Sequence, residues 1–340
     1  MTIDYRSDTV TKPGPAMLEA MMGAPVGDDV FGEDPSINEL EALSAQLFGM
    51  EAALYCPSGT MTNQIAIKCH TQPGDEVICD YSAHIYQYEG GGIASNSGAS
   101  VRLLSGDRGR ITADQVREGI NADDIHKART TLVCLENTSN RGGGSCYDLT
   151  DVEAIREVCN ANGLSLHLDG ARIFNALIAK GQSPADHGKL FHSISICLSK
   201  SLGCPVGSVL VGTTPFIKKA RRIRKALGGG MRQAGFIAAA GVYALKNNIT
   251  RLEDDHRHAR ELAQVLEDKS FVASVLPVET NIIIFEVQPP LTSPALVAKL
   301  KEEGILAYAI SPTQVRLVLH LDISESMVHQ TIEVFNRLNN

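Results

Sequence analysis

Short apolar runs alternate with longer amphipathic segments through residues 52–211. Apolar runs bounded by turn residues predict buried strands, and the segments between them predict helices. Strands that alternate with helices form a mostly parallel, doubly wound sheet, in which ligand sites lie beyond the carboxyl ends of the strands. We expect strands at 52–56, 77–80, 101–104, 131–136, 164–169, 195–198 and 206–211, the last as an antiparallel return.

Helical segments lie between these strands and on both sides of the region. Ser36, followed three residues later by Glu39, is a capping-box pattern and predicts the start of one helix. The expected helices are 16–22, 36–48, 61–69, 84–92, 112–120, 150–161, 172–179, 232–246, 252–266, 293–303 and 324–338.

The ends of the chain follow other patterns. Residues 1–14 form a polar arm, and the last part of the chain combines strand patterns at 281–287 and 314–321 with helices. We therefore divide the chain into an N-terminal arm (1–14), a large α/β domain (15–247) and a small C-terminal α+β domain (248–340). Within 315–321, period-two alternation places Arg316 and His320 opposite a face of leucine and valine.

Composition narrows the possible functions. The chain is 44% hydrophobic and 21% charged, as in ordinary globular enzymes, and its net charge of −8 argues against a nucleic-acid partner. No apolar run reaches membrane-spanning length and the N-terminus has no signal-peptide pattern, so we expect no membrane contact. Eight scattered cysteines without a C-x-x-C pair predict reduced core residues of a cytoplasmic protein.

Two charged residues follow strand patterns in the positions where a doubly wound sheet places its site. Asp169 ends the run 164–169, and Lys200 follows the apolar run that starts at Ser195. An amine and a carboxylate at neighbouring strand ends could hold the aldehyde and the ring nitrogen of pyridoxal phosphate. The alternatives are a solvated loop lysine and an aspartate that caps the helix after it.

Other candidates surround this pair. The turn Ser58, Gly59 and Thr60 between a strand and a helix could hold a phosphate, although an ordinary helix N-cap explains it equally well. Arg172 lies near enough to Asp169 to approach the same ligand, and Arg316 could grip a substrate carboxylate. Both arginines could instead be solvated surface residues.

The histidines offer acid–base chemistry. His84 follows a strand and could lie as a plate over the cofactor ring and act as an acid or base, or be a structural histidine. His126 lies in a polar loop and would by default face solvent. No spacing of His, Asp and Glu suggests a catalytic metal, and neither of the glycine-rich nucleotide motifs occurs.

Taken together, the motifs resemble those of low-specificity threonine aldolases, which are fold-type I enzymes dependent on pyridoxal phosphate. The resemblance runs in order from the N-terminus to about residue 250, and matches the small domain more loosely, chiefly at 315–318. It is carried by the segments 6–11, 26–35, 167–176, 197–200 with 203–208, and 228–233. It implies an α/β fold of the fold-type I transferase-like class, with the mostly parallel large domain and smaller α+β domain described above.

The resemblance also implies roles for individual residues. Lys200 would hold pyridoxal 5′-phosphate covalently, Asp169 would pair with its ring nitrogen and Arg172 would contact its ring hydroxyl. The remaining cofactor contacts would come from Ser58, Gly59, Thr60, Ser199 and the stacked His84, with Lys225 and Arg232 reaching the phosphate of a neighbouring subunit. The substrate carboxylate would be held by Ser7 and Arg316 with Arg172 nearby, and the side-chain pocket bordered by Tyr88 and His126.

The implied reaction is cleavage of L-threonine or L-allo-threonine to glycine and acetaldehyde, with His84 and His126 as candidate bases. Sharing of sites implies a homo-oligomer, a tetramer built as a dimer of dimers, with only a small amino acid as its other partner. Alternatives are β-elimination, racemisation or transamination with the same cofactor, and a non-catalytic scaffold. Ser139 stands where many relatives have histidine, which could alter rate or substrate preference.

Overall fold

A seven-stranded sheet forms the centre of the protein, for which a computed structural model describes residues 2–338. Its strands, in spatial order, are β2 (Ala52–Cys56), β8 (Ser208–Gly212), β7 (Ser193–Cys197), β6 (Ser165–Gly170), β5 (Thr130–Glu136), β3 (Glu76–Asp80) and β4 (Ser100–Leu104). β8 pairs antiparallel with both of its neighbours, and the other pairings are parallel. The predicted mostly parallel sheet and its antiparallel return are confirmed.

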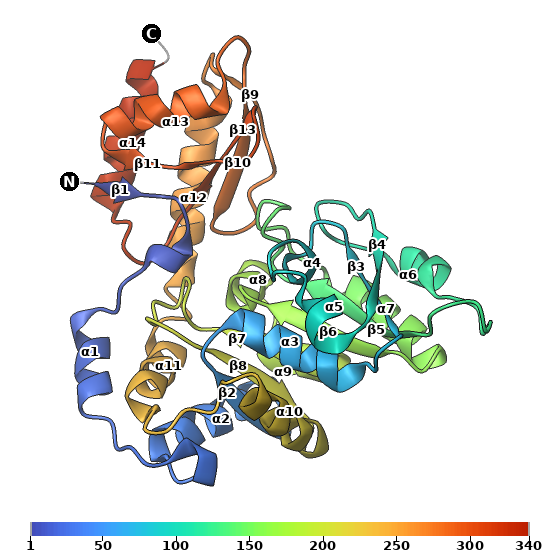
Figure 1. The fold of residues 1–340 in the computed structure, drawn as a ribbon. Helices are drawn as coiled ribbons and strands as arrows, with labels where there is room; N and C mark the ends of the chain where they lie inside the picture. The colour runs from blue at the N-terminus through green and yellow to red at the C-terminus, as the bar shows by residue number, and fades with distance from the viewer. Residues whose placement is uncertain (1, 339–340) are drawn as a thin grey trace.

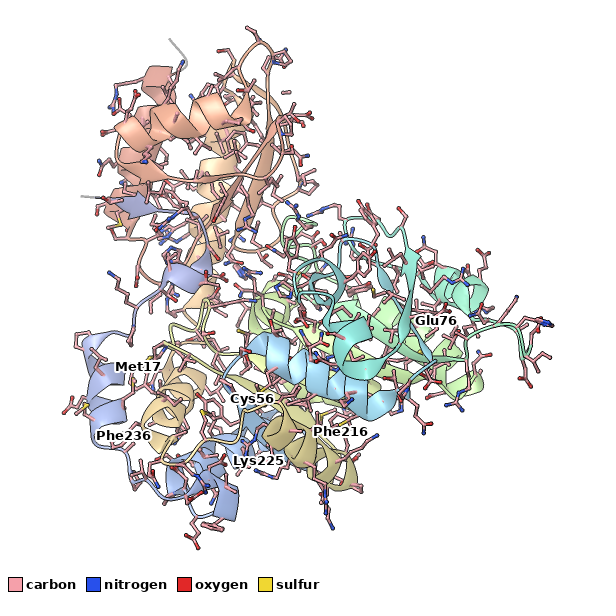
Figure 2. The ribbon with its side chains drawn as sticks, in the orientation of Figure 1. Met17, Cys56, Glu76, Phe216, Lys225 and Phe236 are labelled. Carbon is pink, nitrogen blue, oxygen red and sulfur yellow. The ribbon has the colours of Figure 1, made fainter. Side chains whose placement is uncertain are left out.

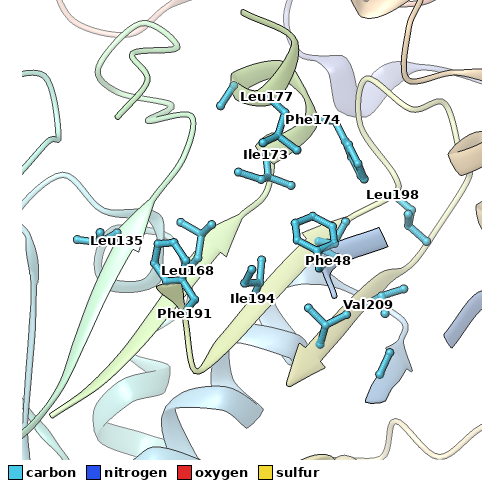
Figure 3. Close-up of a cluster of buried hydrophobic side chains, with 14 of the residues drawn as sticks. Phe48, Leu135, Leu168, Ile173, Phe174, Leu177, Phe191, Ile194, Leu198 and Val209 are labelled. Carbon is cyan, nitrogen blue, oxygen red and sulfur yellow. The ribbon is translucent and has the colours of Figure 1, made fainter. Parts of the chain in front are cut away.

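Helices cover the faces of this sheet (Figure 1). They are α1 (Pro15–Met22), α2 (Pro35–Phe48), α3 (Gly59–His70), α4 (His84–Gln87), α5 (Gly92–Ser97), α6 (Ala113–Gly119), α7 (Leu149–Ala161), α8 (Ile173–Lys180), α9 (Pro184–Leu190), α10 (Thr214–Ala226) and α11 (Gly235–Asn247). The main core lies on one face, where Leu168 and Ile194 of neighbouring strands meet Phe48, Phe174 and Phe191 (Figure 3). This packing fixes strands β6 and β7 side by side.

Two of the expected helices begin or end differently. The Asp34 carboxylate caps α2 by accepting from the N–H groups of Ser36 and Ile37, so the predicted capping box at Ser36 is wrong. A proline at the first position already fits a helix start there, and Asp34 precedes it. The expected helix 84–92 is broken into α4 and α5 because Gly90 and Gly91 adopt positive φ angles of 62° and 70°.

The C-terminal part forms a second body joined to the first through the long helix α12 (Leu252–Glu267). Its antiparallel sheet has the order β12 (Tyr308–Ala309), β13 (Gln314–Val318), β10 (Ile282–Val287) and β9 (Val272–Val275). Helices α13 (Ser293–Glu302) and α14 (Glu325–Leu338) pack with α12 and this sheet around a separate hydrophobic cluster. This arrangement agrees with the predicted smaller α+β unit.

The N-terminal arm connects the two bodies. Its strand β1 (Ile3–Asp4) pairs in parallel with β11 (Ile305–Leu306) of the C-terminal body. Figure 1 shows the next helix, α1, lying beside α11 at the other end of the molecule. Residues 5–14 therefore cross the gap between the two bodies, passing the carboxyl ends of the central strands.

Two composition-based expectations can be compared with the structure. All eight cysteines are buried and none forms a disulfide, and burial raises the thiol pKa of Cys56 and Cys146 to about 12. Within residues 2–338, no helix has both the length and the apolar character needed to span a bilayer.

Candidate active site

Lys200 and Asp169 lie at the carboxyl ends of adjacent parallel strands. Asp169 of β6 is in register with Ser195 of β7, and Lys200 follows the end of β7 in a turn. Both residues lie near enough to His84 to affect its pKa, which the charge of Asp169 raises and that of Lys200 lowers. The sheet thus brings the predicted amine and carboxylate to one side of the molecule, as the strand pattern implied.

A chain of buried polar groups fixes the Asp169 carboxylate. Asn63 of α3 donates from Nδ2 to Asp169 Oδ2 at 3.0 Å, and the Ala171 N–H donates to Oδ1 at 3.1 Å. With its amide nitrogen so used, Asn63 accepts through Oδ1 from His167 Nε2 at 3.1 Å. His167 Nδ1 lies 2.8 Å from Ser193 Oγ and 3.1 Å from the Ser193 carbonyl oxygen, so hydrogen bonds connect Asp169 through Asn63 and His167 to β7.

Burial lowers the pKa of four histidines: that of His70 to about 3, and those of His167, His192 and His256 to about 4. An unfolded histidine titrates near pH 6.5, so below that pH the unfolded chain takes up protons that the folded chain refuses. We expect the contribution of these histidines to the free energy of unfolding to be fully present above about pH 6.5 and to be lost as the pH drops toward 4. Urea denaturation at pH 7.5, 6 and 5 measures this as a falling midpoint, and an unchanged midpoint would contradict it.

His84 opens helix α4 and is held at two points. Its backbone N–H donates to Glu136 Oε2 at 2.8 Å, and its ring Nδ1 lies 3.1 Å from Glu89 Oε1. Burial by itself would lower the pKa of His84, but the hydrogen bond to Glu89 and the charge of Asp169 outweigh it and raise that pKa. The ring is therefore oriented, polarised and close to the predicted cofactor groups.

Glu89 and Glu136 are site residues that the sequence analysis missed. Each is buried, and burial followed by the neighbouring Asp169 charge raises the pKa of Glu136. Glu136 accepts the N–H of His84 with one oxygen and that of Asn140 with the other, at 2.8 and 2.9 Å. Glu136 ends a predicted strand, and that location at a strand end is the sequence signal that could have identified it as a site residue.

Arg172 is wholly buried and paired with the N-terminal arm. Its Nε and Nη2 both donate to the Asp8 carboxylate at 2.7 Å, and Ser201 Oγ donates to the same carboxylate at 2.9 Å. Burial would raise the pKa of Asp8, but Arg172 holds it well below its usual range. Arg172 is thus no surface arginine. Ser7, next to Asp8, accepts from the Thr9 N–H and lies half-buried at the same place.

Arg316 of β13 reaches this cluster from the C-terminal body. It donates from Nη1 to Asn140 Oδ1 at 2.7 Å and from Nη2 to the Arg6 carbonyl at 3.0 Å. Its Nε is buried and has no hydrogen-bond partner among residues 2–338. Burial and the nearby charge of Arg172 lower the pKa of Arg316 to about 10, which leaves the guanidinium charged at neutral pH.

The turn before α3 lies against the ends of β7 and β8. Ser58 Oγ accepts from the Met61 N–H, so Ser58 is a helix N-cap, while Gly59 and Thr60 form the first turn. A Cβ on Gly59 would meet Ser208 Oγ at 3.5 Å and Cys197 Sγ at 3.9 Å, and Cys197 Sγ lies 3.6 Å from Ser199 Oγ. Ser58, Gly59 and Ser199 therefore share one region.

Lys225 and Arg232 lie outside this cluster. Figure 2 labels Lys225 at the carboxyl end of α10, where its side chain is exposed. Arg232 is also exposed and donates to Asp28 Oδ2 at 2.8 Å. The intervening loop packs on the first turn of α3, since a Cβ on Gly229 would overlap Met61 Sδ. Their reach to a second subunit stays a prediction.

His126 does not join the cluster within one chain. It lies in the loop before β5, with 82% of its side chain exposed and Nδ1 at 2.8 Å from Asp124. The same loop donates from Asn121 to Glu76, the residue labelled at the amino end of β3 in Figure 2. The seven residues of β5 span about 20 Å, which places His126 at the opposite edge of the sheet from Lys200. The structure therefore does not bring His126 to this chain's own strand ends, and its place at a side-chain pocket stays a prediction.

Tyr88 and Ser139 flank the site differently. Tyr88 is exposed, with its ring centre 5.6 Å from that of His84 and 5.6 Å from the Arg141 guanidinium carbon. It can therefore border an approaching side chain, as predicted. Ser139 is buried and accepts the Gly142 N–H at 3.2 Å, so its hydroxyl stabilises its own loop.

The residues present fit pyridoxal phosphate. The buried carboxylate of Asp169 suits the ring nitrogen of the cofactor, and the amine of Lys200, beyond the next strand, suits its aldehyde. Ser208 Oγ is buried beside Gly59 without a hydrogen-bond partner within residues 2–338, next to a helix N-terminus of the kind that binds phosphate. This orphaned hydroxyl and the close glycine are the features expected of a phosphate cradle.

Comparisons with known proteins agree with this site. Residues 4–289 match the β-eliminating lyase family. The chain is 45% identical to the low specificity L-threonine aldolase of Escherichia coli K12, over 96% of each chain. It is 41% identical to low-specificity L-threonine aldolase 1 of Arabidopsis thaliana, over 99% of this chain and 96% of that protein.

A solved structure of threonine aldolase from Leishmania major shares the fold, with a TM-score of 0.88 over 99% of this chain and 100% of that one, at 23% identity. The fold and the sequence match together define a fold-type I enzyme dependent on pyridoxal phosphate. The chain belongs to the β-eliminating lyase family and, within it, to the low-specificity L-threonine aldolases.

Proposed function

We propose that this chain uses pyridoxal phosphate to cleave L-threonine and L-allo-threonine to glycine and acetaldehyde. The observation that carries the proposal is the parallel register of β6 and β7, which puts Asp169 and Lys200 at adjacent strand ends. The buried Arg172 and the half-buried Arg316 add two cations near the same region, as an amino-acid carboxylate requires. The similarity to named threonine aldolases supports the choice of substrate.

The protein's groups divide the work by position. Lys200 would supply the amine that holds the cofactor. Asp169, fixed by Asn63 and the Ala171 N–H, keeps a proton at the ring nitrogen. Gly59, Thr60, Ser199 and Ser208 would hold the cofactor's phosphate. When bound, the protonated cofactor supplies an electron sink for the electrons of the breaking bond.

Orientation selects the bond. Arg316, with Ser7 nearby in the arm, would hold the substrate carboxylate and so set which bond to Cα is aligned for cleavage. His84 lies on the same side with its Nδ1 engaged by Glu89, so its Nε2 is the atom available to take the β-hydroxyl proton. Because His126 lies at the other edge of the sheet, His84 is the base we favour within one chain.

A product assay tests the proposal. Purified protein loaded with pyridoxal phosphate is incubated with L-threonine, L-allo-threonine or L-serine, and glycine, acetaldehyde, ammonia and 2-oxo acid are quantified. We expect glycine and acetaldehyde in equal amounts from the first two substrates. Ammonia with 2-oxobutyrate would instead show β-elimination, the second candidate, which the family match favours. Absence of all four products would leave racemisation or a non-catalytic scaffold, which chiral analysis of the recovered amino acid separates.

The assembly and location of the protein are proposed from its surface. Met22 of α1 and Phe31 are 79% and 73% exposed, which is typical of an apolar face that contacts another subunit. We propose a homotetramer, a dimer of dimers, in which Lys225, Arg232 and His126 act at a neighbouring subunit's site. The eight free buried cysteines support a reducing compartment, the cytoplasm.

A further inference from the structure

We propose that Glu89 is a positioning residue that fixes the tautomer of His84, holding the proton at Nδ1 and leaving Nε2 as the acceptor. This inference rests on the proposed function in one respect, that His84 acts on the substrate's β-hydroxyl. A buried carboxylate that hydrogen-bonds one nitrogen of a catalytic imidazole fixes the orientation and the tautomer of the ring. It assigns a role to a carboxylate that neither the cofactor nor the substrate is expected to touch.

The contacts of Glu89 define it as an acceptor. Its side chain is fully buried, and its Oε1 accepts from Asn63 Nδ2 at 2.9 Å and lies 3.1 Å from His84 Nδ1. Its Oε2 accepts from Gln64 Nε2 at 2.6 Å. Asn63 and Gln64 can only donate through these nitrogens, so both oxygens of Glu89 act as acceptors. Because both oxygens of Glu89 already accept from amide groups, the hydrogen between Glu89 and His84 is assigned to Nδ1.

The backbone of His84 and its imidazole ring are held by different carboxylates. The backbone of His84 is anchored independently, because its N–H donates to Glu136 at 2.8 Å. Changing Glu89 therefore acts on the imidazole ring while helix α4 keeps its start. Glu89 is also linked to the ring-nitrogen partner, since Asn63 Nδ2 donates to both Glu89 and Asp169.

The charges that face His84 predict the direction of any change. The carboxylates of Glu89 and Asp169 raise its pKa, the ammonium of Lys200 lowers it, and Glu136 approaches through the backbone N–H. Replacing Glu89 by glutamine removes a contacting negative charge, so the pKa of His84 falls. The glutamine amide can also donate to Nδ1, which moves the ring proton to Nε2 and removes the acceptor.

The first measurement is independent of catalysis. Diethylpyrocarbonate modifies neutral imidazoles, and the rate of His84 modification against pH, read by peptide mass spectrometry, gives its titration midpoint in the full chain without cofactor. We expect the midpoint to move to lower pH in Glu89→Gln and to stay in place in Glu118→Gln, a change at an exposed glutamate. Exposed His126 serves as an internal control in every sample. An unmoved His84 midpoint in Glu89→Gln overturns the proposal.

The second measurement uses the holoenzyme. In Glu89→Gln, kcat is expected to fall by about 10- to 100-fold, less than the 100- to 10,000-fold that a general base contributes, while the acidic limb of kcat/KM moves to lower pH. A purely structural role would lower kcat without moving the limb and would overturn the proposal. If the glutamine variant does not fold, Glu89→Asp is measured, which keeps the charge and shortens the reach. A full kcat in that variant would equally overturn it.

Loss of aldolase activity and an unmoved His84 midpoint are distinguishable outcomes. A holoenzyme that gives no glycine from L-threonine removes the proposed function, whatever the modification rates show. A normal aldolase whose His84 titrates identically with and without the Glu89 charge removes the positioning role alone. Support for both requires the shifted midpoint and the shifted limb together.

Discussion

Lys200→Ala is expected to reduce threonine cleavage by about 10⁴-fold or more, the loss seen when a member of a catalytic unit is removed. The side chain of Lys200 provides the amine that the cofactor needs for covalent attachment. Borohydride reduction of the wild-type holoenzyme should fix the cofactor on the peptide that contains Lys200, and should fix none on that peptide in the variant. Both measurements follow from its place beyond β7.

Lys189→Ala is the matched control for this prediction. Lys189 lies on α9, is exposed and pairs with Asp186 at 2.9 Å, far from the strand ends that form the site. Its loss should leave the activity and the reduced peptide unchanged. Full activity of Lys200→Ala, or a reduced cofactor mapped to another lysine, would remove the basis of the proposed chemistry.

The strand-end residues could be predicted from the sequence because the α/β alternation fixes where strands end. Lys200 and Asp169 follow apolar runs that the structure confirms as β7 and β6, and parallel strands present those ends at one edge. Arg316 was placed by the period-two alternation of its strand, which sets the face on which it lies. These inferences used only local patterns.

The partners of these residues could not be predicted, because they come from distant parts of the chain. Asp8 and Arg172 are 164 positions apart, and Asn140 and Arg316 are 176 apart. No periodicity connects them, and only the crossing of the N-terminal arm between the two bodies brings them together. The position of His126 could not be read from local patterns either, since its loop precedes a strand and lies at the opposite edge of the sheet.

The N-terminal arm unites the three cationic groups of the site. Asp8 pairs with Arg172, the Arg6 carbonyl accepts from Arg316, and Thr11 Oγ1 donates to the Lys200 carbonyl at 2.9 Å. The strand β1 fastens the same segment to the C-terminal body. The arm therefore sets the distance between the substrate anchor on one body and the cofactor groups on the other.

Arg316→Ala is expected to raise KM for L-threonine by about 30- to 1,000-fold, because it removes a buried charge-assisted contact worth about 2–4 kcal/mol. The Nε of Arg316 is buried without a partner among the described residues, so a substrate carboxylate would satisfy a donor that the free protein leaves unpaired. Binding of pyridoxal phosphate, followed by its absorbance, should be unchanged, because the cofactor contacts come from the other body.

Arg316→Lys separates charge from geometry in this prediction. A lysine keeps the positive charge but cannot form the two-pronged contact that a guanidinium makes with a carboxylate, so its KM should lie between those of the wild type and the alanine variant. The kcat of both variants should also fall, because a loosely held carboxylate lets the Cα–Cβ bond rotate away from the perpendicular. An unchanged KM in Arg316→Ala would place the carboxylate anchor elsewhere, with Arg172 as the remaining buried cation.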